Sequence, residues 1–265
     1  MKHLSLTCSL IGLALLTSSL TRAQAPAAPT AASAGAKAPA RGADAILDDF
    51  ATALGKQALA RHKSLYMKRA VSVKAMGVEG TEERWANASG KYLLQMTLPG
   101  VGTMKSGSTG AGKSGVRWSE DPINGLRILK GAEDEQARME ASWNAELQLK
   151  QLFKTREAQP APAGAPKDRP LECVQLTPAQ AAPVTMCFDA TTHLLSYQEG
   201  KQQSPQGEVP YAVKFSDWRE VQGVKRPHRE EMTVGPMSLE ARLTEVQFGA
   251  KIDPTRFKMP NPAKP

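Results

Sequence analysis

The sequence predicts an α+β fold, in which a curved antiparallel sheet or incomplete β-barrel of about 10 to 11 strands packs two helices on its concave face. Apolar residues recur about every fourth position over 44–63 and over 132–150, which is typical of amphipathic helices. In most other stretches apolar and polar residues alternate, which indicates strands with one buried and one wet face. Turn residues separate these short runs, so the strands are expected to follow one another as antiparallel neighbours.

The first predicted helix begins near Asp44 and presents one apolar stripe, formed by Ile46, Phe50, Leu54 and Ala58. Its acidic residues lie in the first turns and its basic residues toward the end, as the helix dipole favours. The second predicted helix runs without interruption from about Ala132 to Lys150. Its stripe consists of Met139, Trp143 and Leu147.

The strands follow from alternation. The clearest case is 91–98, where one face carries Tyr92, Leu94, Met96 and Leu98. The strand that starts near Met67 places Val71 and Val73 on one face in the same way. The acidic pairs Glu82-Glu83 and Glu230-Glu231 alternate faces within their strands, and we expect them to be solvated.

The N-terminus has the features of a secretory signal peptide over 1–23: a short basic start, an apolar stretch and small residues before a predicted cut at Gln24. Cys8 comes too early for a lipobox, so the predicted location is periplasmic or secreted. The alanine- and proline-rich stretch 24–42 reads as a flexible linker. The domain is expected to span 43–258, with a disordered tail over 259–265.

Composition excludes some functions and offers no catalytic constellation. The formal charge of the 265 residues is +8, but basic residues do not cluster with aromatic ones, which argues against nucleic-acid binding. Residues 107–114 match the phosphate-loop pattern GxxxxGK[ST], but the context lacks the buried strand and following helix that nucleotide binding needs. We therefore predict no nucleotide, no metal, no cofactor and no enzymatic activity. The least favoured functional hypotheses are a hydrolase with dispersed catalytic residues and a P-loop NTPase.

Removal of the predicted signal peptide would take away Cys8 and leave two cysteines, Cys173 and Cys187. They lie in two strand-like runs separated by a Pro- and Ala-rich turn. An antiparallel hairpin would bring both thiols within disulfide range. Neither cysteine has a histidine at ligand spacing, so a disulfide is favoured over a metal site or two free thiols.

Four short motifs, in this order along the chain, resemble the LolA/LolB-like superfamily of periplasmic outer-membrane lipoprotein carriers. They are WANASGKY at 85–92, GVRWSEDP at 115–122, CFDATTHLL at 187–195 and FSDWREVQGV at 215–224. The chain departs from the family pattern in lacking the proline usual before the glycine-lysine-tyrosine turn. It also carries a long loop over 158–170. The resemblance covers about 43–258 and identifies a divergent member.

This resemblance implies an exported, non-enzymatic binding protein that holds a lipid or a lipoprotein acyl chain in an apolar cavity. A membrane surface or an envelope protein would be a further partner. On this view the expected cavity and lid residues are Phe50, Val71, Val73, Tyr92, Leu94, Met96, Leu98, Trp118, Met139 and Trp143. The alternative is a structural or interaction module of the envelope, in which the same residues form a filled core and the surface meets a protein partner.

Overall fold

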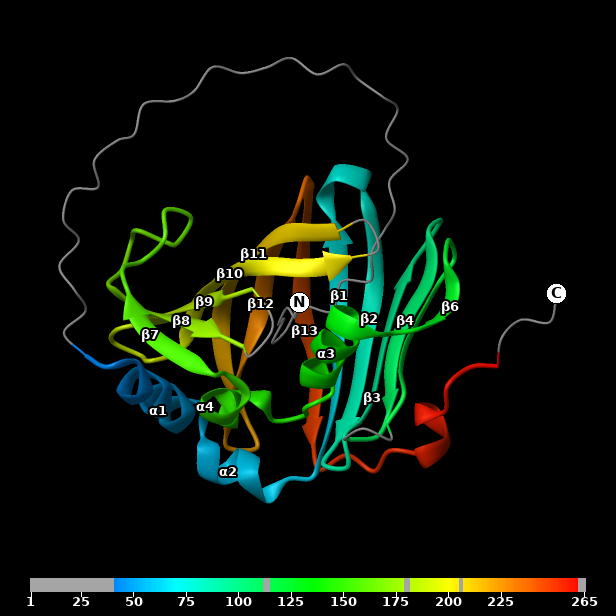
Figure 1. Ribbon diagram of the computed structural model, residues 1–265, viewed down its shortest axis with the longest axis horizontal. Coiled ribbons are helices and arrows are strands. Elements are labelled where there is room, and N and C mark those ends of the chain that lie inside the picture. The colour runs from blue at the N-terminus through cyan, green and yellow to red at the C-terminus, as the bar shows by residue number, and fades with distance from the viewer. Residues whose placement is uncertain (1–40, 112–114, 179–181, 205–206, 262–265) are drawn as a thin grey trace, which may run out of the picture.

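The computed structural model describes residues 41–111, 115–178, 182–204 and 207–261, so the predicted signal peptide and most of the predicted linker lie outside it. Its described strands form one antiparallel 13-stranded sheet in the order β6-β5-β4-β3-β2-β1-β13-β12-β11-β10-β9-β8-β7 (Figure 1). The strands are β1 (Ser64–Val73), β2 (Val78–Asn87), β3 (Lys91–Leu98), β4 (Gly102–Thr109), β5 (Arg117–Asp121), β6 (Gly125–Ile128), β7 (Thr155–Gln159), β8 (Leu171–Thr177), β9 (Val184–Asp189), β10 (Leu195–Ser204), β11 (Gly207–Val221), β12 (Val224–Val234) and β13 (Met237–Phe248).

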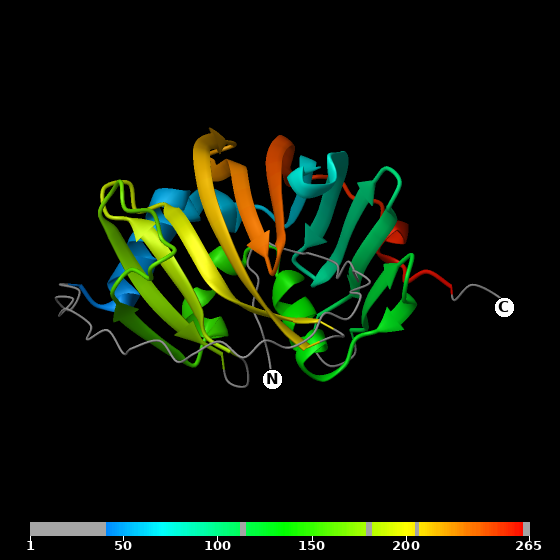
Figure 2. The same ribbon diagram turned by 90° about the horizontal axis from the view of Figure 1, so that it is seen from above.

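The sheet is strongly curved and does not close, because β6 and β7 lie at its two ends. Seen end-on it forms an arch, with the green helices α3 and α4 beneath it (Figure 2). The helices are α1 (Ala43–Leu54), α2 (Lys56–Arg61), α3 (Gly131–Glu140) and α4 (Leu149–Leu152). Short 3₁₀ turns are η1 (Lys74–Met76), η2 (Ala145–Leu147) and η3 (Pro254–Phe257). This architecture confirms the predicted curved antiparallel α+β fold, with more strands than expected.

Both predicted helices are interrupted. The first breaks at Gly55, whose left-handed backbone (φ 92°) separates α1 from α2, although the apolar stripe stays buried on both sides of the break. The second was expected to be continuous, but α3 ends at Glu140 and is followed by a turn, η2 and α4. This break lets Trp143 and Ala145 both enter the core, which one continuous helix face would not allow. The next strand, β7, begins only at Thr155.

We call residues 131–153 the crossing segment. Its helix α3 contacts β4 and β5 at one end of the sheet and β10 toward the other, so it spans the concave side (Figure 1). Helix α1 contacts β7, β8 and β12, and α4 packs against α1. The ring of Phe50 on α1 lies 4.9 Å from that of Phe188 on β9. The concave face of the sheet, its inner face, is thus covered by two pieces of chain that are far apart in sequence.

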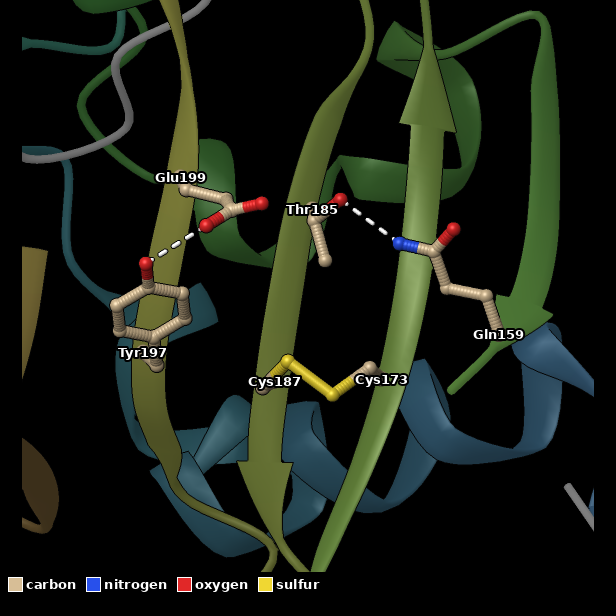
Figure 3. The surroundings of a disulfide bond; sticks show 6 residues. All are labelled: Gln159, Cys173, Thr185, Cys187, Tyr197 and Glu199. Atoms are coloured by element: carbon tan, nitrogen blue, oxygen red, sulfur yellow. Dashed lines mark hydrogen bonds between the residues drawn. A yellow bond between two sulfur atoms is a disulfide. The ribbon is translucent and has the colours of Figure 1, made fainter. Parts of the chain in front are cut away.

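The outer face carries two smaller apolar clusters. Trp85, Leu93 and Trp118 pack with Phe257 of η3, and the second cluster surrounds the Cys173–Cys187 disulfide. Cys173 and Cys187 are direct partners in the register of β8 and β9, which confirms the predicted disulfide (Figure 3).

The predicted loop over 158–170 covers this disulfide rather than lying free on the surface. Ala165 is buried against the cysteines and Tyr197, and a Cβ at Gly164 would lie 2.5 Å from the hydroxyl of Tyr197. That hydroxyl donates to Glu199 at 2.7 Å (Figure 3). The loop therefore helps to cover the outer cluster, and both cysteines are shielded from water.

Candidate functional site

The inner face of the sheet carries one continuous apolar cluster. Nine of the ten predicted cavity and lid residues belong to it, and none is more than 7% exposed. These nine are Phe50, Val71, Val73, Tyr92, Leu94, Met96, Leu98, Met139 and Trp143. Alternation within β1 and β3 places the strand residues on this face, while α1 and the crossing segment supply the others. The structure therefore brings these nine together as a packed interior; whether they contact a ligand stays a prediction.

Trp118 is the exception, because it lies on the outer face. Its register partner on β4 is Gly107, and the register partner of Gly107 on β3 is Leu93, which belongs to the outer cluster. The indole packs so closely over Gly107 that a Cβ there would lie 2.5 Å from the ring. The family resemblance implies Trp118 as a cavity residue, but alternation does not assign it a face, because β5 has only five residues and both Arg117 and Trp118 are buried.

A pocket of about 560 Å³ opens at the rim of the inner face, between α2, the β2–β3 turn and the crossing segment. We call it the rim pocket. Met139, Trp143 and Leu152 contribute to its apolar wall, and Lys63 and Arg138 are among its polar residues. Its volume falls within the range of about 300 to 1,000 Å³ that is usual for small-molecule sites. Two predicted lid residues therefore border open space as well as the core.

Charged residues are also buried on the inner face. Arg69 of β1 donates from Nε to Glu82 of β2 at 2.8 Å and from Nη1 to Glu230 of β12 at 2.7 Å. The three side chains are 4–5% exposed. The expectation that Glu82 and Glu230 are solvated is therefore wrong, because the alternation of these strands places both carboxylates on the inner face, where Arg69 lies between them.

Burial acts on the pKa values of two of these groups, Glu230 and Arg69. It raises the pKa of Glu230 above its ordinary value of 4.5, although the neighbouring Arg69 acts in the opposite direction. Burial also opposes the charge of Arg69, but Glu230 and Glu82 outweigh it and raise the pKa of that guanidinium. Arg69 is thus held as a cation between the two carboxyl groups, which is the arrangement that a buried charge requires.

Two further arginines extend this cluster to the crossing segment. Arg84 of β2 donates from Nη2 to the carbonyl of Glu140 at 2.9 Å, and Arg226 of β12 donates from Nη1 to the carboxylate of Glu146. We call Arg69, Glu82, Arg84, Glu146, Arg226 and Glu230 the inner charge cluster. All of these residues except Glu82 line a cavity of about 20 Å³, together with Met67, Pro227 and Leu243. This volume is close to the minimum that holds one water molecule.

Sequence reasoning missed the inner charge cluster, although a signal for it was present. Arg69 has the same parity as Met67, Val71 and Val73 in the first strand, and therefore had to share their face. No comparable signal located Glu230, because pairing of β1 with β13, and hence proximity to β12, depends on the order of strands in the sheet.

The phosphate-loop-like stretch lies on a hairpin as far as it is described. Gly107, Ser108 and Thr109 end β4, and β5 returns antiparallel to it. Gly112, Lys113 and Ser114 lie outside the described residues, so the expectation that the motif binds no nucleotide stays a prediction. Within the described ranges, no group of three or more His, Cys, Asp or Glu residues could hold a metal ion. In the same ranges, no helix has the length and apolar character to cross a membrane.

No protein-family model matches the sequence, and no curated protein matches it either. Solved structures are similar to it in fold. A domain from Vibrio parahaemolyticus, named for outer membrane lipoprotein sorting, has a TM-score of 0.53 at 12% identity and covers 81% of this chain and 97% of its own. A LolA superfamily protein from Nitrosomonas europaea has a TM-score of 0.52 at 12% identity, covering 83% and 99%. A DUF1329 family protein from Desulfovibrio piger has a TM-score of 0.55 at 10% identity, covering 82% and 97%.

These similarities extend over almost the whole length of each matched structure, and they agree with the resemblance that the four sequence motifs indicate. At 10–12% identity they concern the fold alone. The chain therefore has the fold of the LolA superfamily and of lipoprotein-sorting domains.

Proposed function

We propose that this chain is an exported, non-enzymatic binding protein that holds a lipid or a lipoprotein acyl chain beneath the crossing segment. The observation that carries this proposal is the rim pocket, because Met139 and Trp143 border it and also belong to the inner apolar cluster. An acyl chain that enters the pocket would reach apolar side chains by displacing the crossing segment. The predicted signal peptide and the disulfide support a location in the periplasm or outside the cell.

The energetics suit an acyl ligand. Each methylene transferred from water to an apolar site stabilises the complex by about 0.8 kcal/mol, so binding needs apolar walls and few specific contacts. Methionine is well suited to such walls because its side chain is flexible and polarizable. Met96 and Met104 from the strands, and Met139 from α3, all belong to the inner cluster.

The first test is native mass spectrometry of the protein exported by its own leader, with organic extraction of whatever co-purifies. We expect a bound lipid or acylated peptide that leaves on denaturation. Trp143→Ala should weaken its uptake about tenfold, since it removes an indole from the pocket wall. Trp85→Ala is the matched control: both indoles are 7% exposed, but Trp85 lies in the outer cluster. The proposal would be supported if the Trp85→Ala variant retained the co-purifying ligand and the Trp143→Ala variant lost it.

The second candidate is an interaction module of the envelope with a filled interior. It is favoured by the packing of the nine inner residues, which are buried against one another and their neighbours. A mass without ligand, together with no uptake of added lipids or acylated peptides, would overturn the carrier proposal and favour this module. Equal loss of uptake in both tryptophan variants would also contradict a site beneath the crossing segment.

A further inference from the structure

The inner charge cluster is balanced only while the crossing segment is in place. Three arginines, Arg69, Arg84 and Arg226, face three glutamates, of which Glu82 and Glu230 belong to the sheet and Glu146 to the crossing segment. The same segment supplies the Glu140 carbonyl that accepts from Arg84. If the segment moves aside, the sheet retains three cations and two carboxylates among apolar side chains.

Arg226 has an unused edge for an oxyanion. The residue is 4% exposed, and its guanidinium donates from Nη1 to Glu146, while Nε and Nη2 are buried and have no hydrogen-bond partner among the described residues. Nε and Nη2 form one edge of the guanidinium, which can hold a carboxylate or phosphate in bidentate fashion. The buried Nε of Arg84, which lines the same cavity, also has no hydrogen-bond partner within the described part of the chain.

From this geometry we propose that the ligand is an anionic amphiphile. Its acidic head group binds Arg226 and Arg84 in place of Glu146 and the Glu140 carbonyl, and its acyl chain lies among the inner apolar residues. The inference rests on the proposed function and adds the chemistry of the head group. A neutral lipid would leave a buried cation without compensation, which is strongly unfavourable, whereas an oxyanion restores the balance.

The cavity of about 20 Å³ is too small for such a head group while Glu146 occupies its place. Glu146 therefore acts as an internal competitor, and the head group enters only as the crossing segment leaves. A fatty-acid carboxylate and a phospholipid phosphate share the required chemistry. They differ in size and charge, so binding assays can separate them.

The test is calorimetric titration of the full mature chain with decanoate, decyl phosphate and decan-1-ol, which share a ten-carbon chain. We expect one or both anions to bind at least about tenfold more tightly than the alcohol. The anion that binds more tightly identifies the head group as carboxylate or phosphate. Arg226→Gln should abolish this preference, because the anions lose a donor and decan-1-ol no longer leaves that cation uncompensated. Arg229→Gln is the matched control, because Arg229 is on the same strand but pairs with Glu231 and Glu240.

Glu146→Gln provides a second variant that keeps the size of the side chain. A neutral amide competes less well for Arg226, so both anions should bind several-fold more tightly to this variant. If all three ligands bind wild type equally and neither variant changes this, the head-group inference is wrong while the carrier function stands. If none of the three binds, the proposed function itself fails.

Discussion

The two faces of the sheet are closed in different ways. The inner face has one continuous cluster, covered by α1 and by a crossing segment that spans the sheet between its two halves. The outer face has two separate clusters, each covered by a short piece of chain that packs locally. Phe257 of η3 covers Trp85 and Trp118, and Ala165 covers the disulfide.

The polar contents of the two faces differ as well. The inner face buries the inner charge cluster, which includes donors of Arg84 and Arg226 that have no partner among the described residues. The outer disulfide cluster instead has satisfied polar neighbours, such as Tyr197 with Glu199 and Gln159 with Thr185 (Figure 3). Buried polar groups that lack partners reduce stability, so proteins retain them mainly where they have a use. A buried donor without a described partner also occurs on the outer face, at Trp118 Nε1, so the proposed division of roles, recognition inside and stabilisation outside, rests on the ties of Arg84 and Arg226 to the crossing segment.

The largest effect is expected from Arg69→Met on the inner face. The substitution leaves Glu82 and Glu230 buried without their shared cation, and breaking a buried pair in this way costs about 3–5 kcal/mol. Urea denaturation would measure the loss in free energy of unfolding. Arg242→Met is the control, because Arg242 is exposed and its pair with Glu240 should contribute within about 1 kcal/mol.

The same experiment can separate lost charge balance from lost packing. Replacing Glu82 and Glu230 by leucine in the Arg69→Met background removes the two uncompensated carboxylates. Because well-packed apolar groups can substitute for a buried ion pair, this triple variant should recover most of the lost stability. A triple variant no more stable than Arg69→Met alone would show that the charges are not the cause.

The second-largest loss of stability is expected on the outer face, from removal of the disulfide. Replacing both Cys173 and Cys187 by alanine should lower the free energy of unfolding by about 3 kcal/mol, since the bond closes a loop with a sequence separation of 14. The reduced wild-type protein should unfold at the same urea concentration as the double variant. Acyl uptake should persist in the folded variant, because the disulfide lies on the face away from the inner cluster. Loss of uptake at full folding would contradict the division of roles between the faces.

A smaller effect tests the position of Trp118. Gly107→Ala introduces a Cβ only 2.5 Å from the indole, and overpacking of this kind costs about 1–3 kcal/mol. Adding Trp118→Leu makes room, so Gly107→Ala should be less destabilising in that background than in wild type. Thermal unfolding of the four proteins gives this coupling. Independent, additive effects would mean that Trp118 does not pack over Gly107.

The sequence predicted the faces of strands better than the position of single residues. Alternation over 91–98 placed Tyr92, Leu94, Met96 and Leu98 correctly, because eight residues contain four repeats of the period. Strand β5 has five residues with Arg117 and Trp118 both buried, so its pattern could not assign a face. The register with Gly107 decides it, and register is a property of the assembled sheet.

Helix ends and buried charges are also features that a local sequence pattern does not reveal. The period-four stripe continues through Gly55, so only backbone geometry reveals the break between α1 and α2. The acidic pair Glu230-Glu231 alternates as a solvated pair would, but a buried Arg69 from a strand more than 150 residues earlier reverses the outcome for Glu230. Local patterns thus determine strands and hairpins such as that of the disulfide, whereas contacts between distant strands need the topology.

The smallest expected effect lies at the edge of the inner face, where α1 is tied to β7 by an exposed ion pair. Arg156 donates from Nε to Asp44 at 2.6 Å, and this hydrogen bond lowers the pKa of Asp44 below its ordinary value of 3.8. A carboxylate whose pKa is lowered by folding contributes stability above its ordinary pKa and loses it as the pH falls through the lowered value. Asp44→Asn should therefore lower stability at pH 7 by less than about 1 kcal/mol and by progressively less toward pH 3. Arg156→Gln should abolish the pH dependence of that difference. A constant gap between wild type and Asp44→Asn from pH 7 to pH 3 would show that this pair does not hold α1 against the sheet.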